Sequence, residues 1–219
     1  MSAEGVELTF CFVDLAGFSA LTEAHGDEEA VDLLGRFEDK ARAALGSGGR
    51  LVKTIGDAVM MAFDAPETAL QTTRLLFESC ASEEGLPLPR AGLHHGSAIG
   101  RGGDYFGASV NLASRVAAQA HGGQALGTAS VADVARAVRL NVVELGAFDL
   151  HNLSAPVTLF DLGVLPAAAG MAVDPVCRMH VARDGAAGRL RHQGVDYWFC
   201  SLACVRSFAE APGRYHKGR

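Results

Sequence analysis

Residues 12–19 read FVDLAGFS, and this stretch marks a passage from a strand into a helix. The run that leads to it, from residue 7 to Asp14, is apolar and typical of a buried strand. Small residues then make a turn, and a helix is predicted after Gly17. The stretch therefore places the carboxylate of Asp14 beside a helix N-terminus, whose free N–H groups suit a phosphate.

Helices and strands alternate on the C-terminal side of this stretch. Asp27 is a good N-cap for a helix that ends before Gly46, and Gly56-Asp57 is typical of a hairpin turn. The predicted order is βαββαβα, in which the first α stands for both the helix after Gly17 and the helix from Asp27, followed by a short helix and two strands. The ranges after the first helix are 27–45, 50–55, 58–63, 66–84, 91–99, 108–120, 131–138, 142–150 and 157–164. This order predicts an α+β fold in which helices cover one face of a central sheet.

The chain of 219 residues divides into two parts that differ in charge. Residues 166–219 carry 8 basic and 4 acidic residues, a net charge of +4, whereas residues 1–165 carry 11 and 21, a net charge of −10. The C-terminal part also holds three of the five cysteines and the single tryptophan. Small residues and a proline near residues 163–170 indicate the boundary. We expect domains at residues 7–163 and 172–217, with a linker at residues 164–171.

Composition limits the partners that the protein can have. A net charge of −6 disfavours binding to nucleic-acid phosphates and to anionic lipid. No apolar run approaches the ~20 residues needed to cross a bilayer, and the start lacks a basic and apolar leader. We therefore expect no nucleic-acid partner, no membrane and a cytoplasmic location. In that reducing compartment, five cysteines favour thiols or metal ligands over a disulfide framework.

Asp14 and Asp57 are two carboxylates that core packing does not require. On neighbouring strands, such a pair can hold two Mg²⁺ or Mn²⁺ ions that bridge a polyphosphate. The alternative is that Asp14 caps a helix and Asp57 is an ordinary turn residue. Residue types alone do not decide between these interpretations.

Asn111 and Arg115 are four residues apart in an otherwise small and apolar segment, so they share one helix face. An amide and a guanidinium that point the same way can clamp a phosphoryl group and an ether oxygen in a transition state. Taken alone, the pair fits a solvated helix face better. Its combination with the two aspartates favours the functional interpretation.

Residues from about 9 to 162 resemble the class III nucleotide cyclase catalytic domain, which has a ferredoxin-like, palm-like fold. Three ordered motifs carry the resemblance: FVDLAGFS at 12–19, KTIGD at 53–57, and DYFGASVN at 104–111 continued to Arg115. The resemblance implies roles for the motif residues. Two divalent ions are bound by Asp14, Leu15 and Asp57; the triphosphate is contacted by Gly17, Phe18 and Ser19; charge on the α-phosphate is stabilised by Arg115; and the ribose is oriented by Asn111.

The resemblance also implies a homodimer, because the sites of this family form between two catalytic domains. One domain is expected to give both aspartates and Lys53. The other is expected to give Asp104 together with Asn111 and Arg115. Two shared sites per dimer follow.

Lys53 and Asp104 occupy the two positions that read the base in this family. A lysine donor and an aspartate acceptor complement adenine, which presents an acceptor at N1 and a donor at its 6-amino group, whereas guanine mismatches both. The pair therefore favours ATP over GTP. His151 lies where cyclases often place a basic contact to the triphosphate; a plain surface histidine is the alternative.

The C-terminal part is too small to be comfortably stable without a staple. Cys200 and Cys204 are four residues apart where a strand passes into a helix, so one helix face can present both thiols to the same ion. Residues 172–216 resemble the YHS domain, a relative of the TRASH metal-binding modules and a small αβ, treble-clef-like fold. The implied ligands are Cys177, Cys200 and Cys204. Arg178 departs from the pattern, since the family commonly has glycine there.

Three thiolates suit Cu(I) in trigonal geometry, whereas Zn²⁺ requires a fourth ligand, for which His180 and Met179 are nearest in sequence. The alternatives are three reduced core cysteines around an aromatic cluster, or an oxidised pair. Cys11 and Cys80, in the larger domain, are typical of ordinary buried thiols.

These features together predict a homodimeric adenylate cyclase that converts ATP into cyclic AMP and pyrophosphate, with a C-terminal metal domain that modulates it. One alternative is a guanylate cyclase. Another is a copper sensor or carrier in which the cyclase fold serves only as a dimerisation scaffold.

Overall fold

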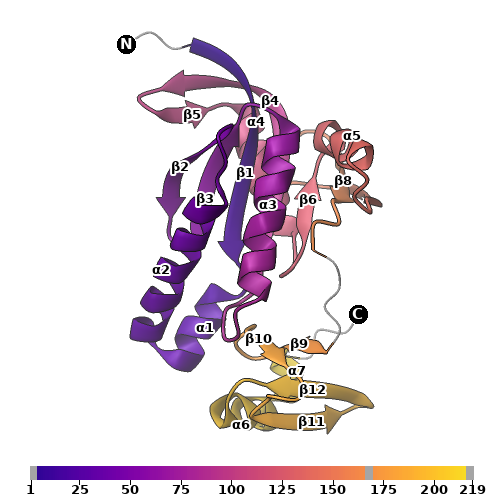
Figure 1. The fold of residues 1–219 in the computed structure, drawn as a ribbon. Helices are drawn as coiled ribbons and strands as arrows, with labels where there is room; N and C mark the ends of the chain where they lie inside the picture. Colours follow the sequence, from indigo (N-terminus) through magenta and orange to yellow (C-terminus); the bar gives the residue numbers. More distant parts are fainter. Residues whose placement is uncertain (1–3, 166–169, 216–219) are drawn as a thin grey trace.

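The computed structural model describes residues 4–165 and 170–215, which form a sheet domain and a smaller C-terminal module (Figure 1). In chain order, the sheet domain comprises β1 (Glu4–Leu15), α1 (Phe18–His25), α2 (Asp27–Ala44), β2 (Gly49–Ile55), β3 (Ala58–Phe63), α3 (Pro66–Ala81), β4 (Pro89–Arg101), β5 (Asp104–Phe106), α4 (Ala108–Gln119), β6 (Ala125–Gly127), α5 (Ala129–Ala137), β7 (Val143–Phe148) and β8 (Val157–Asp161).

Within residues 4–165, eight strands form one mixed sheet in the order β2-β3-β1-β4-β6-β8-β7, with β5 paired to β4. The central strand β1 runs antiparallel to β3 and to β4. In this register Asp14 lies opposite Ala58 on one side and opposite Arg90 on the other. The C-terminal end of β1 and the starts of β3 and β4 therefore meet at one end of the sheet.

Helices cover both faces of the sheet, so the prediction that they cover one face is wrong for α4. Side chains alternate along β1. Cys11 and Val13 belong to the core under α2, α3 and α5, whereas Leu8 and Phe10 pack with Val110 and Ala113 of α4. α4 approaches β4 closely because residue 92 is glycine: a Cβ atom there would lie 2.0 Å from the backbone nitrogen of Ala117.

The predicted order of elements is otherwise confirmed, with two short strands added. β5 lies inside the glycine-rich stretch 100–107, and β6 has only three residues, so neither has a visible hydrophobic period. Asp27 is the first residue of α2, and the N-cap is Gly26, whose φ is 90°. The carboxylate of Asp27 therefore makes no capping hydrogen bond, contrary to the prediction.

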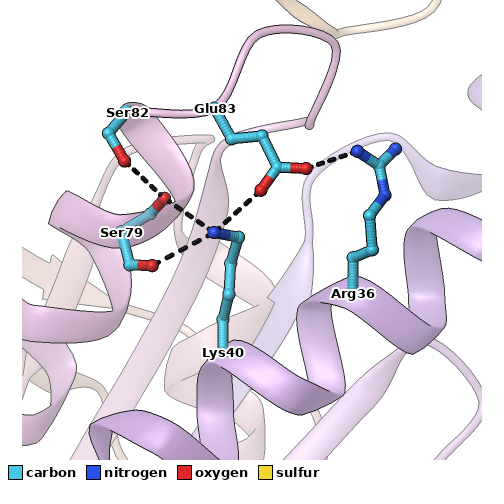
Figure 2. Close-up of polar contacts among 5 residues, drawn as sticks. All are labelled: Arg36, Lys40, Ser79, Ser82 and Glu83. Carbon is cyan, nitrogen blue, oxygen red and sulfur yellow. Dashed lines mark hydrogen bonds and ion pairs between the residues drawn. The ribbon is translucent and has the colours of Figure 1, made fainter.

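A polar cluster ties α2 to the C-terminal end of α3 (Figure 2). Lys40 Nζ donates to the carbonyl oxygen and to the hydroxyl of Ser79, both at 3.1 Å, and forms an ion pair with Glu83 at 2.8 Å. Arg36 also pairs with Glu83. A lysine at the last carbonyls of a helix satisfies groups that have no partner within that helix. The cluster fixes the start of the loop that leads from α3 to β4.

The C-terminal module consists of two hairpins and two short helices. Its elements are β9 (Met171–Val173), β10 (His180–Ala182), β11 (Gly188–His192), β12 (Val195–Phe199), α6 (Leu202–Glu210) and α7 (Pro212–Tyr215). Phe208 of α6 packs against Phe199 and Tyr197 of β12, with ring centroids 5.4 and 4.8 Å apart. This small aromatic core holds α6 on the second hairpin.

The module docks against α1 and against the loop between α3 and β4, as Figure 1 shows at the lower end of the sheet domain. Met179 forms an isolated β-bridge with Pro87 of that loop, and the His180 amide donates to the Leu86 carbonyl at 3.4 Å. The two parts of the chain therefore share backbone contacts.

Candidate functional site

Asp14 and Asp57 are neighbours at one end of the sheet. Asp14 is the penultimate residue of β1, and Asp57 lies in the turn between β2 and β3, directly before the residue that pairs with Asp14. Gly56 has a φ of 59° and so provides the left-handed conformation that this tight turn needs. Burial raises the pKa of Asp57, and the negative charge of Asp14 raises it further. Two carboxylates that influence each other in this way can share bound cations.

Arg90 binds Asp14 with two hydrogen bonds, and the sequence analysis did not identify it. Its Nε donates to Oδ1 at 2.5 Å, and its Nη2 donates to Oδ2 at 3.0 Å. This bidentate arrangement is the strong form of a guanidinium–carboxylate pair. The only signal in the sequence is a basic residue near the start of the strand at 91–99. Its relation to Asp14 depends on the pairing of β1 with β4.

Lys53 forms an ion pair with Asp104 in the same chain, with Nζ 2.6 Å from Oδ2. The other carboxylate oxygen of Asp104 accepts the backbone N–H of Tyr105 at 2.8 Å. The prediction takes Lys53 from one domain and Asp104 from the other, whereas the two residues already form a pair within this one chain. β2 and β5 bring the two residues together, so a single chain carries the complete donor and acceptor pair.

Asn111 and Arg115 lie on α4, which packs on the sheet through Val110 and Ala113. Asn111 is exposed and Arg115 is half-buried. Within the described ranges, neither side chain has a hydrogen-bond or ion-pair partner. In this single chain they therefore make no polar contact with Asp14 or Asp57.

The remaining residues predicted to contact substrate lie on two separate segments. Gly17 is the N-cap of α1 with a φ of 82°, Phe18 is half-buried, Ser19 is exposed and Leu15 is buried at the end of β1. These four residues follow Asp14 directly in the chain. His151 is exposed in the turn before Asn152, and within residues 4–165 it forms no hydrogen bond or ion pair with the two carboxylates.

Cys177, Cys200 and Cys204 form one cluster, as the sequence predicts. The sulfur atoms of Cys177 and Cys200 are 3.3 Å apart, and those of Cys200 and Cys204 are 3.8 Å apart. Hydrogen bonds from the Cys177 and Cys200 thiols lower the pKa of Cys204, and burial opposes this effect. The cluster therefore favours a thiolate, which is the form that binds metal ions.

The carboxylate of Asp174 organises the two segments that carry these cysteines. It is fully buried and accepts the amides of Val176 and Cys200, each at 2.8 Å, and that of Cys177 at 3.4 Å. Burial raises the pKa of Asp174, and these hydrogen bonds oppose the effect. One side chain thus holds the turn after β9 against the end of β12.

Arg178 has a φ of 68°, which explains why glycine suits this position. Its side chain lies over Gly17, where an added Cβ atom would meet Arg178 Cγ at 2.2 Å. The departure from the family pattern therefore places a long side chain against the turn that follows Asp14.

The fourth donor at the cysteine cluster is His25, the last residue of α1, and not His180 or Met179 as predicted. His25 Nε2 lies 3.6 Å from the sulfur of Cys200, and the four donor atoms all lie within 4.8 Å of one another. His180 is buried outside this group, with Nδ1 unpaired among the described residues. Met179 pairs with Pro87 instead. A lone histidine 175 residues from Cys200 gave no signal in the sequence.

The other two cysteines behave as predicted. Cys11 and Cys80 are fully buried in the sheet domain, and burial raises the pKa of each thiol to about 12. They are inert packing residues. Among the helices that the structure describes, none has the length and apolar character that a bilayer crossing requires.

Comparisons with known proteins identify both parts of the chain. The family described as "Adenylate and Guanylate cyclase catalytic domain" matches residues 2–160, and the YHS domain matches residues 172–219. An uncharacterised protein of Mycobacterium tuberculosis is 37% identical over 158 residues, which are 72% of this chain and 41% of that protein. An adenylate cyclase of Streptomyces coelicolor is 44% identical over 106 residues, 48% of this chain and 28% of that protein. The chain thus corresponds to less than half the length of these relatives.

Solved structures support the same fold. The adenylate/guanylate cyclase/hydrolase of Silicibacter pomeroyi superposes with a TM-score of 0.63 at 26% identity, over 73% of this chain and 97% of that one. An adenylyl cyclase of P. aeruginosa superposes with a TM-score of 0.63 at 24% identity, over 77% and 97%. The palm-like sheet domain predicted from the motifs is thereby confirmed.

Proposed function

Since the chain belongs to the adenylate and guanylate cyclase catalytic domain family and continues into a YHS domain, we propose that it converts ATP into cyclic AMP and pyrophosphate. The observation that carries this proposal is the carboxylate pair of Asp14 and Asp57, held next to Arg90 at one end of the sheet. Neither the core nor the turn requires this concentration of charge. A polyphosphate that arrives with its divalent ions would be bound by these groups.

The donor set fits Mg²⁺ or Mn²⁺, because these hard cations prefer carboxylate and carbonyl oxygens. Asp14 and Asp57 would hold two ions, together with the backbone of Leu15. When bound, the ions supply charge neutralisation for the triphosphate and activation of the ribose 3′-hydroxyl.

Arg90 has a role both without and with nucleotide. Without ions it neutralises Asp14. With Asp14 engaged in holding a cation, the Arg90 guanidinium would be free to bind the phosphates, for which its fork of donors is well matched. The α1 N-terminus beyond Gly17 offers unpaired N–H groups to the same anion, as expected of a helix start.

Asn111 and Arg115 are proposed to act on the substrate of a second copy of the chain. Their side chains have no partner within the described residues of one chain, although both are of the type that orients ribose and stabilises a charged phosphoryl group. A homodimer with two shared sites would bring them to the ions of the other chain. We infer that the complete site forms on dimerisation.

Lys53 and Asp104 support adenine as the base. Without nucleotide they satisfy each other at 2.6 Å. Adenine can take both roles, accepting from Lys53 at N1 and donating its 6-amino group to Asp104. Lys53 and Asp104 are partly exposed in this structure, with side-chain exposures of 37% and 29%. Guanine would leave both unpaired, at a cost of about 1 to 3 kcal/mol for each group that the bound base covers. Because this pair lies in one chain, we further infer that it comes from the same chain as Asn111 and Arg115.

The test is an assay of the purified full chain with ATP or GTP and Mn²⁺, with the cyclic product separated by chromatography. We expect cyclic AMP from ATP and at least about tenfold less product from GTP. The Asp57→Asn variant, which keeps the shape of the turn, serves as the inactive control. Product from GTP alone would favour the guanylate cyclase alternative. A folded protein that makes neither product but binds copper or zinc would favour the sensor alternative.

A further inference from the structure

The cysteine cluster includes a histidine from the other domain, and we propose that His25, Cys177, Cys200 and Cys204 form one four-coordinate Zn²⁺ site that fastens the YHS domain to helix α1. The three ligands predicted from the sequence all belong to the YHS domain, and the proposal adds a fourth from the sheet domain. It concerns a site separate from the nucleotide site and does not depend on cyclase activity.

The separations between the donor atoms fit a tetrahedral zinc ion. With bonds of about 2.3 Å to sulfur and about 2.0 to 2.1 Å to nitrogen, tetrahedral geometry requires about 3.8 Å between two sulfurs and about 3.6 Å between sulfur and nitrogen. The corresponding distances here are 3.3 and 3.8 Å between sulfurs, and 3.6 Å from Cys200 to His25 Nε2. Little rearrangement is therefore needed to accept the ion.

The environment of His25 also suits a metal ligand. Nε2 points to the sulfur atoms, while Nδ1 lies 3.8 Å from the carboxylate of Glu29, one turn further along in α2. A carboxylate that accepts a hydrogen bond from the second ring nitrogen usually fixes the tautomer and the orientation of a ligating histidine. Glu29 is the carboxylate placed to do so, although 3.8 Å is longer than a hydrogen bond and its side chain must approach to form one. The His25 side chain is only 14% exposed, and Cys177 and Cys204 are buried. Two of the four donors are thus buried, and the other two, His25 and Cys200, are only partly exposed.

The fourth donor changes which ion the cluster prefers. Three thiolates alone suit trigonal Cu(I), whereas three thiolates and an imidazole are a common structural site for Zn²⁺. His180 does not compete, because it lies outside the group of donor atoms within 4.8 Å. The position of His25 therefore favours zinc.

Zinc at this site would hold the C-terminal end of α1. The module touches the same helix at two further points: Arg178 covers Gly17 at its start, and Arg214 pairs with Glu23 at 3.2 Å. The Arg214–Glu23 pair is exposed on both sides and contributes little to docking. A metal ligand on His25 is the strongest of these links, and α1 itself begins four residues after Asp14. Occupancy of the cluster would therefore restrain the turn at the nucleotide site.

The experiment measures metal binding to the full chain in reducing buffer. Wild type should bind one equivalent of Zn²⁺, and Co²⁺ should give the visible absorption of a tetrahedral ion with sulfur ligands. His25→Ala should weaken Zn²⁺ binding by about 100-fold or more, because loss of even an outer-shell partner typically costs 10- to 100-fold, and should alter the Co²⁺ spectrum. His25→Cys, which restores a donor, should recover tight binding. His121→Ala, an exposed histidine in the same domain, is the matched control.

Hydrogen exchange provides a second readout that does not depend on activity. Zn²⁺ should slow exchange of the α1 amides at residues 18–25 in wild type and in His121→Ala, but not in His25→Ala. The proposal is overturned if His25→Ala binds Zn²⁺ as tightly as wild type with the same Co²⁺ spectrum. It is equally overturned if wild type binds only Cu(I), or no ion. If His25→Ala does not fold, the Co²⁺ spectra of wild type and of His25→Cys still decide. A fourth thiolate in His25→Cys should shift the spectrum away from that of wild type, and identical spectra in the two proteins would contradict a histidine ligand.

Discussion

The cysteine cluster and the carboxylate pair differ in how much of each site one chain assembles. In the cluster, four donors from both domains already lie within 4.8 Å of one another. At the carboxylates, Asp14 is bound by Arg90, and Arg115 on α4 has no partner among the described residues. The difference indicates that a folded single chain is ready for a thiophilic ion. Under the proposed function, by contrast, the nucleotide site is completed only by its cations, its substrate and a second chain.

The same short helix connects the two sites. α1 starts beside the turn that follows Asp14 and ends at His25, so the eight residues of one helix separate the two groups of ligands. An isolated helix of this length is unstable in water and depends on tertiary contacts. Leu21 anchors the helix in the core of the sheet domain, and Arg178 and the cysteine cluster add contacts at its two ends.

The largest effect is expected from mixing two inactive variants. Asp57→Ala removes a proposed cation ligand, and Arg115→Ala removes the proposed transition-state contact. Each change should lower cyclase activity by about 10²- to 10³-fold. A one-to-one mixture should recover about a quarter of the wild-type rate, because half of the dimers are mixed and each has one intact site. The rate of cyclic AMP formation after co-refolding measures this.

The control is Asp57→Ala refolded alone by the same procedure, and it should stay inactive. If the two different variants also stay inactive together, although both form dimers by light scattering, each chain builds its site alone. The contrast between a complete and an incomplete site would then not hold.

The choice of base should change by a smaller factor. Replacing Lys53 by Met and Asp104 by Ala removes both halves of the proposed reading pair. The ratio of kcat/KM for ATP to that for GTP should fall by about 10- to 100-fold, in line with 1 to 3 kcal/mol for each unpaired group. Lys40→Met, which breaks the cluster of Figure 2 far from the base, should leave the ratio unchanged even if stability falls. An unchanged ratio in the double variant would remove Lys53 and Asp104 from base recognition.

The sequence predicted those parts of the sites that depend on local pattern. Asp14 and Asp57 flank a hairpin that pairs with β1, so strand and turn signals sufficed to make them neighbours. Cys200 and Cys204 lie one helical turn apart, and motif spacing placed Cys177 with them.

The missed residues depend on long-range register and docking. Arg90 meets Asp14 across a strand pairing of residues 76 apart, and His25 meets Cys200 across 175 residues. The pairing of Lys53 with Asp104 within one chain was not predicted, because β5, which brings Asp104 to Lys53, has only three residues and no hydrophobic period. The placement of α4 on the second face likewise depends on the close approach at Gly92.

Replacing Arg90 should affect cations and nucleotide in opposite directions. Arg90→Ala frees Asp14, so Mn²⁺ binding without nucleotide should tighten by about two- to fivefold, since a partly exposed ion pair contributes up to about 1 kcal/mol. The KM for ATP should rise by about tenfold, because a charged contact to phosphate is lost. Calorimetry and initial rates measure the two effects. Arg90→Lys keeps the positive charge but not the paired donors of the guanidinium, so both its Mn²⁺ affinity and its KM for ATP should lie between those of wild type and Arg90→Ala. Weaker Mn²⁺ binding in Arg90→Ala would contradict the proposed release of the guanidinium.

The smallest effect is a gain in stability at the carboxylate pair. Burial raises the pKa of Asp57 above its usual value, so the folded state holds that proton more tightly than the unfolded state does. Stability is therefore lost as the pH rises through the raised pKa, and the full penalty applies at neutral pH. In the absence of divalent ions, Asp57→Asn should remove this cost of a buried negative charge and raise the free energy of unfolding by about 0.5 kcal/mol. The value is small because the side chain is only half-buried and its charge is screened by solvent.

Urea unfolding at neutral pH and at a pH below the ordinary range of an aspartate measures this difference. The gain should be present at neutral pH and disappear in acid, where Asp57 is protonated in both states. Cys80→Ala is a useful contrast, because it removes a fully buried thiol that is uncharged at either pH, so its effect on stability should be the same in both buffers. A loss of stability in Asp57→Asn at neutral pH would mean that the carboxylate holds the β2–β3 turn together. Asp57 would then have a structural role, as Asp174 has at the cysteine cluster. It would not be a destabilising charge that is retained for cation binding.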